Sequence, residues 1–72
     1  MDIEKALAAV EYKLATDSDS FESGRIIRMD IHSGWPPATE LADALARRQP
    51  FVSLYYEHQA NEKVQLVLQK IR

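Results

Sequence analysis

The stretch Ala38–Tyr56, with the sequence ATELADALARRQPFVSLYY, decides the predicted fold. Within it, Leu41, Ala42 and Leu45 recur at helical spacing, which predicts a short helix with one apolar face. We expect this helix to end just before Pro50, because a proline pushes the residue that precedes it out of the α region. The stretch is therefore expected to begin with one helix and a sharp break.

A second helix is predicted to begin at Pro50, since the first turn of a helix does not need the N–H that proline lacks. Val52, Tyr55 and Tyr56 would form the buried face of this second helix. Two short helices joined by a tight turn are typical of a helix-turn-helix.

The same residues resemble the helix-turn-helix domains of phage repressors and related bacterial regulators. Ala42 and Leu45 occupy the small and the leucine position of that pattern, and Gln49–Ser53 (QPFVS) occupies the start of its second helix. The resemblance extends over residues 25–59. The family usually has glycine in the turn, where this chain has Ala46. The resemblance implies a domain that binds DNA as a dimer.

Length and composition indicate one small domain. The chain has 72 residues, no cysteine and a net charge of −2. A domain of this size rarely gains more than about 3–5 kcal/mol from its core, so we expect a homodimer. No segment approaches the roughly 18 consecutive apolar residues of a membrane-spanning helix. Since the N-terminus also lacks a signal-peptide pattern, a cytoplasmic protein without membrane contact is expected.

The charge is uneven along the chain. Residues 1–24 carry six acidic and two basic side chains, a net charge of −4, whereas residues 25–72 carry five acidic and seven basic ones, a net charge of +2. The half with the family resemblance is therefore mildly basic, which suits DNA. Ordinary solvated surface would give the same pattern.

The first helix is predicted at Asp2–Thr16, as an extra N-terminal helix (residues 1–17) that precedes a helical core (residues 20–71). Asp2 is favourable there because acidic groups stabilise helix N-termini. Tyr12 lies off the apolar stripe and is expected to be exposed. The stripe packs this helix on its own domain, or else the helix serves as a dimer arm. It consists of Ile3, Leu7, Val10 and Leu14.

The next segment allows two assignments. A helix over Ser20–His32 would place Ile27 and Ile31 on its apolar side. A strand over residues 25–31 would place Ile27, Met29 and Ile31 on one face. We predict the helix, because a single strand would have no partner elsewhere in the chain.

A stiff connector, Ser33–Pro37, is expected to follow, with Trp35 packed on the core. The last helix is predicted at Asn61–Ile71, and one unbroken helix over Pro50–Ile71 is the alternative. The apolar stripe of this last helix consists of Val64, Val67, Leu68 and Ile71.

The chain shows no pattern typical of an enzyme. His32 and His58 are the only histidines, and neither has a neighbour at metal-ligand spacing. No Gly-x-Ser-x-Gly turn presents a nucleophile, and two glycines cannot form a phosphate-binding loop. We therefore predict neither catalysis, nor a metal, nor a cofactor.

The family resemblance also implies a set of DNA-contacting residues. Gln49 would begin the recognition helix and Ser53 would follow one turn later, so that both could reach base edges. Thr39, Arg47 and Arg48 would lie near the phosphate backbone. Plain solvated surface is the alternative interpretation of this set.

The outward side of the predicted second helix also suits a protein partner. Helical geometry would gather Phe51, Leu54 and His58 there as a small apolar patch. Glu57 on the same side would repel phosphate. With Tyr12 of the first helix, these three residues form the predicted protein-contact set.

Taken together, the sequence predicts an all-α fold, a compact bundle of four or five short helices with a central helix-turn-helix, as a single domain over residues 1–72. The first hypothesis is a small transcriptional regulator that binds operator DNA in the major groove as a dimer. The alternative is a helix-turn-helix-shaped interaction protein, such as a phage-type anti-activator or anti-repressor, that inhibits another regulator without binding DNA. Only fold analogy connects the fold to DNA.

Overall fold

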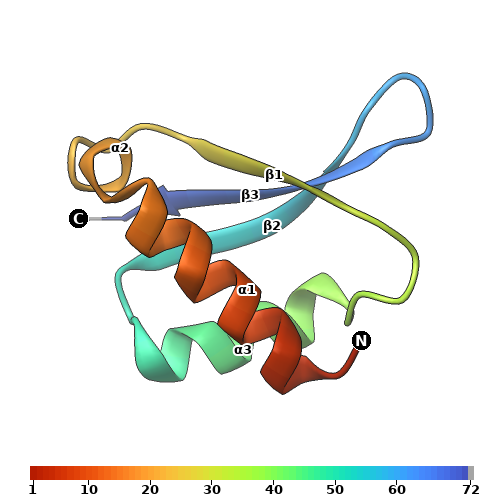
Figure 1. Cartoon of the computed structure of the whole chain (residues 1–72), viewed down its shortest axis with the longest axis horizontal. Coiled ribbons are helices and arrows are strands. Elements are labelled where there is room, and N and C mark those ends of the chain that lie inside the picture. The colour runs from red at the N-terminus through yellow and green to blue at the C-terminus, as the bar shows by residue number, and fades with distance from the viewer. Residues whose placement is uncertain (72) are drawn as a thin grey trace.

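The computed structural model describes residues 1–71 and shows a mixed α/β protein (Figure 1). Three helices and three strands follow one another along the chain. In order, they are α1 (Ile3–Thr16), α2 (Ser18–Glu22), β1 (Ile27–Ile31), α3 (Ala38–Arg48), β2 (Val52–His58) and β3 (Val64–Lys70).

The predicted all-α bundle is therefore wrong, and with it the central helix-turn-helix. The first helix of the expected motif is present as α3, but the expected second helix is strand β2 and the expected last helix is strand β3. Val52 and Leu54 are both buried in the core, which is the period-two alternation of a strand. The segment after Pro50 thus buries alternate residues rather than one helical stripe.

The sheet has the strand order β1-β3-β2, and both pairings are antiparallel. β3 is therefore the central strand, and β1 and β2 run parallel to each other on its two sides. Leu66 of β3 pairs with Met29 of β1 and with Tyr56 of β2. The crossover from β1 to β2 passes through α3, as a connection between parallel strands requires.

The prediction of the first helix is confirmed. Asp2 is its N-cap, and the Asp2 carboxylate accepts a hydrogen bond of 2.8 Å from the backbone N–H of Lys5. The helix is not an appended arm, because its stripe lies in the same core as the sheet. The buried residues of α1 are Ala6, Leu7, Val10 and Leu14.

The helix predicted over Ser20–His32 is wrong beyond Glu22. The chain leaves the short helix α2 through Gly24, whose φ of 82° is left-handed, and then forms β1. The strand alternative was correct in placing Ile27, Met29 and Ile31 on one face, since all three pack in or against the core. The partner that seemed to be missing is β3.

The connector and α3 follow the prediction closely. Gly34 has a φ of 104°, and Pro37 is the N-cap of α3. Trp35 is half-buried and packs against the core. At the other end, Gln49 is the C-cap and donates its backbone N–H to Leu45, so the break before Pro50 is confirmed.

One layer of helices covers one face of the sheet. In Figure 1, α1 and α3 lie on the same side of the strands, and their apolar side chains share a core with the inward-facing residues of all three strands. Leu7, Leu41, Leu45, Leu66 and Leu68 are among the largest fully buried side chains. No helix of residues 1–71 covers the other face of the sheet, which is therefore open to solvent.

The turn between β2 and β3 contains an unusual backbone conformation. The backbone N–H of Glu62 donates to Gln59 at 3.2 Å, and that of Gln59 donates to Lys63 at 2.7 Å. Glu62 has a φ of 64°, the only positive φ at a non-glycine residue within residues 1–71. Hairpins of this kind usually place glycine at the left-handed position, so a glutamate there is strained.

We expect Glu62→Gly to stabilise the fold by about 1 kcal/mol, because glycine adopts the left-handed conformation without the steric cost of a side chain. In a domain of this size, that gain raises the Tm by roughly 4–8 °C. The matched control is Asn61→Gly, one residue earlier where φ is not positive, which should lower the Tm. Thermal unfolding followed by circular dichroism measures both, and a lower Tm for Glu62→Gly would contradict the strain.

Candidate functional site

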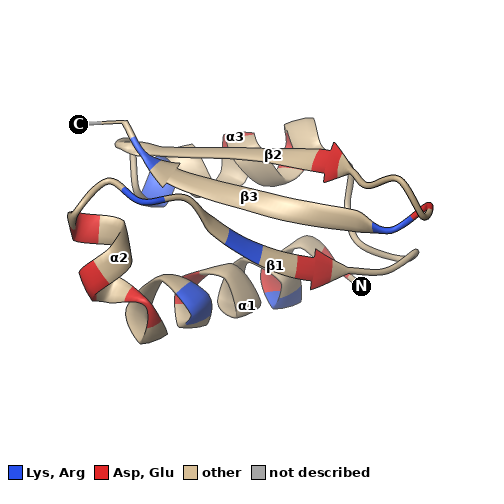
Figure 2. Ribbon diagram, turned by 90° about the horizontal axis from the view of Figure 1, so that it is seen from above, with Lys and Arg blue, Asp and Glu red and all other residues tan. Residues whose placement is uncertain are grey.

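The open face of the sheet is the main surface that the fold leaves uncovered. Its residues alternate with those of the core, so that Val67 of β3 lies between Arg28 of β1 and Tyr55 of β2. Figure 2 views this face, with β2 passing in front of α3. Although it faces away from the helices, Val67 is 0% exposed, because side chains from both neighbouring strands flank it.

One end of the open face carries several exposed apolar side chains, with the polar pair Ser53 and Gln69 among them. Tyr55 is 43% exposed, Ile71 is 60% exposed and Ile26, which immediately precedes β1, is 46% exposed. Phe51 borders them, because the backbone N–H of Ile71 donates to the Phe51 carbonyl at 2.8 Å. We call these four residues, together with Val67, the apolar patch. Within residues 1–71, it contains four of the six exposed large hydrophobic residues.

The other end of the open face is polar, and its groups pair with one another. Arg28 reaches diagonally across β3 to Glu57, with 2.8 Å between Nη1 and Oε1. The Gln65 amide donates to Asp30 at 3.0 Å, and the Gln59 amide donates to Glu57 at 3.0 Å and to Gln65 at 3.2 Å. We call these five residues the polar network. It connects all three strands.

The polar network changes the acidity of one of its members. The hydrogen bond from Arg28 lowers the pKa of the Glu57 carboxyl below its ordinary value of 4.5, and the hydrogen bond from Gln59 lowers it further. A lowered pKa means that the charged form is favoured in the folded state. The resulting stabilisation is present above pH 4.5 and is lost as the pH falls through the lower value.

The residues predicted to contact DNA do not form one surface. Thr39 lies in the first turn of α3 and Arg47 in its last turn, about 12 Å away along the helix axis at the usual rise per residue. Ser53, on β2, lies on the open face of the sheet. Gln49 is the half-buried C-cap of α3.

Arg48, also predicted to contact DNA, is engaged within the chain. Its guanidinium pairs with Glu11 at 3.2 Å and with Glu4 at 3.0 Å, both on α1. These hydrogen bonds raise the pKa of Arg48 above its ordinary value. The residue therefore forms ion pairs between α3 and α1, a role that its position in the sequence does not reveal.

The residues predicted to contact a protein also lie on different parts of the molecule. Leu54 is only 8% exposed and belongs to the core, so its predicted place on an outward apolar face is wrong. The error arises because a strand, unlike a helix, sends Phe51 and Leu54 to opposite faces. His58 is exposed at the end of β2, and Tyr12 is 75% exposed on α1. Only Phe51 lies in the apolar patch.

The sequence reasoning missed most of the apolar patch. Ile26, Tyr55, Val67 and Ile71 become neighbours only through the register of three strands. The signal that was available is the alternation in β2, where Phe51 and Tyr55 fall on one face and Val52 and Tyr56 on the other.

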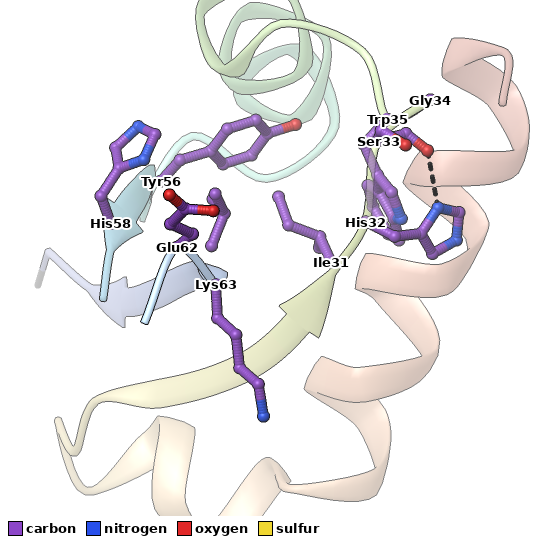
Figure 3. A pocket seen from close by; sticks show the side chains of 10 residues that line it. Ile31, His32, Ser33, Gly34, Trp35, Tyr56, His58, Glu62 and Lys63 are labelled. Atoms are coloured by element: carbon purple, nitrogen blue, oxygen red, sulfur yellow. Dashed lines mark hydrogen bonds between the residues drawn. The ribbon is translucent and has the colours of Figure 1, made fainter. Parts of the chain in front are cut away.

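A pocket of about 510 Å³ lies at the end of the sheet near the polar network (Figure 3). It is formed by the end of β1, the connector to α3, the end of β2 and the turn before β3. The Tyr56 hydroxyl donates to the Pro36 carbonyl, and burial raises the pKa of Tyr56. The lining residues that bear on function are Trp35, Tyr56, His58, Glu62 and Lys63.

Comparisons with known proteins found no matching family model, no matching curated protein and no matching solved structure. Within residues 1–71, no helix is long and apolar enough to cross a membrane. The same residues contain no group of three or more side chains that could hold a metal ion.

We expect Arg28→Met to raise the pKa of Glu57 towards its ordinary value, because the substitution removes the main hydrogen bond that favours the carboxylate. A side-chain NMR titration of Glu57 measures this pKa directly. The matched control is Arg47→Met, which removes an exposed arginine of α3 and should leave the titration unchanged. An unchanged pKa in Arg28→Met would show that the ion pair does not hold in solution.

Proposed function

We propose that the protein acts by binding rather than by catalysis, and that its open sheet face binds a second copy of the same chain. The observation that supports this proposal is the apolar patch. It gathers large exposed apolar side chains around Ser53 and Gln69, on a face that no helix of residues 1–71 covers. Exposed apolar clusters of this kind often mark the surface that contacts another protein.

A second copy suits this face because the face is complementary to itself. A two-fold symmetric contact places the same patch on both subunits, so that apolar side chains meet apolar side chains. Beyond the patch, the polar network offers both signs of charge, with Arg28 beside Asp30 and Glu57. Because these charged groups already have partners within the chain, that end brings no unpaired charge to the contact.

The size of the chain sets how much of the face must take part. A standard interface buries about 800 Å² per partner, roughly one sixth of the 4799 Å² that this chain exposes. The contact must therefore extend beyond the apolar patch, which lies at one end of the open face, towards the polar network at its rim. Such a division between core and rim is typical of protein interfaces.

Like the alternative hypothesis, this proposal assigns the chain a protein-binding function. The binding surface is the sheet and not the outward side of a helix. The prediction of operator binding stays a prediction. The element that was expected to enter the major groove is strand β2, and the residues expected to contact DNA lie on different parts of the molecule. A separate regulator on the open face is the competing occupant, and the experiment below distinguishes the two.

Sedimentation velocity across the micromolar range tests the proposal. We expect the wild type to form dimers, and Tyr55→Ser to weaken the dimer by about tenfold or more, since central aromatic residues dominate interface energies. The matched control is Tyr12→Ser, which removes an exposed tyrosine on α1 and should leave the dimer intact. Circular dichroism of each variant verifies that the fold is kept.

Two results would overturn the proposal. A wild type that stays monomeric at every concentration would exclude the second copy and leave a different protein as the occupant of the face. A dimer that survives Tyr55→Ser but dissociates with Tyr12→Ser would place the contact on α1 instead.

A further inference from the structure

The pocket at the end of the sheet has aromatic and aliphatic walls. Trp35, in the connector before α3, and Tyr56, on β2, both line it, together with Ile31 and Val64 (Figure 3). Because the Tyr56 hydroxyl already donates to the Pro36 carbonyl, this residue offers a ligand the face of its ring. A volume of about 510 Å³ lies within the range of small-molecule sites.

The charged groups at the pocket are not equivalent. In Figure 3, the Glu62 carboxylate lies on the same side as the Tyr56 ring, whereas the Lys63 ammonium points away from it. His32 is turned aside, with its Nδ1 2.7 Å from the Ser33 carbonyl oxygen. Within residues 1–71, no hydrogen bond or ion pair engages the Glu62 carboxylate. An unpaired anion therefore lies beside the Tyr56 ring at this pocket.

The backbone at Glu62 gives a second reason to connect this residue with a ligand. Its left-handed φ of 64° would suit glycine better, and the carboxylate makes no contact within the fold that repays the strain. Strain of this kind is often retained where a side chain serves a ligand.

We propose that this pocket binds a small organic cation, such as a quaternary ammonium group. The electron-rich ring faces of Trp35 and Tyr56 would contact its alkyl groups, and the Glu62 carboxylate would neutralise its charge. The site is independent of the dimer contact, because its lining residues do not include those of the apolar patch.

Trp35 is the only tryptophan of the chain, so its fluorescence reports directly on this pocket. The probe is choline, and the control ligand is dimethylbutanol, in which a carbon atom replaces the charged nitrogen. We expect choline to change the Trp35 emission saturably and to bind about fivefold or more tightly than dimethylbutanol. Sodium chloride at matched concentration controls for ionic strength.

The paired variants test the role of the carboxylate. Glu62→Gln should weaken choline binding by about fivefold or more and leave dimethylbutanol binding unchanged. Glu40→Gln, which removes an exposed acidic group of α3, should leave both unchanged. Amide proton–nitrogen NMR spectra should shift at the pocket residues when choline is added, and they verify that each variant is folded.

Three results would each overturn the assignment: no saturable change up to about 0.1 M choline, equal affinity for choline and dimethylbutanol, or unchanged choline binding in Glu62→Gln. None of them depends on the oligomeric state. Failure of the cation site can therefore be distinguished from failure of the dimer.

Discussion

Strand β3 is the constraint on which the rest of the structure depends. It pairs with β1 on one side and with β2 on the other, so that neither outer strand has a sheet without it. Leu66, Val67 and Leu68 are all 0% exposed, which means that β3 is buried on both of its faces. Since a two-stranded hairpin alone is marginal in water, the second pairing of β3 decides whether the chain forms a stable sheet.

The position of β3 also explains why the two faces of the sheet differ. Its inward leucines pack under α1 and α3, which surface ion pairs from Arg48 to Glu4 and Glu11 also connect. Its outward residues have no helix above them. There the polar network satisfies its own charged groups, and the apolar patch remains as the part of the open face that gains most from a partner. The proposed dimer follows from this asymmetry.

The helices could be predicted because their determinants are local. The Asp2 cap and the stripe of α1 lie within one segment, and so do the apolar face and the break before Pro50 in α3. The strands could not be separated from helices in this way. Val64, Val67 and Leu68 fit a helical stripe, yet Val64, Leu66 and Leu68 fit a strand equally well. Pro50 was interpreted as the start of a helix, although it also suits the turn before a strand.

These errors were coupled, because a strand is stable only when its partners exist. If residues 52–58 and 64–70 are helices, a strand that contains Ile27, Met29 and Ile31 has no partner, and the alternation of these three residues then supports no strand. The candidate site failed for the same reason. Phe51 was recognised as a contact residue, but Ile26, Tyr55 and Ile71 join it only through the strand register, which no local pattern contains.

The central position of β3 can be measured most directly by NMR in solution. We expect cross-strand nuclear Overhauser effects from Val67 to both Arg28 and Tyr55, as the register requires. Uninterrupted sequential amide–amide contacts over residues 64–70, without those cross-strand contacts, would show a helix in place of β3 and would exclude a central strand.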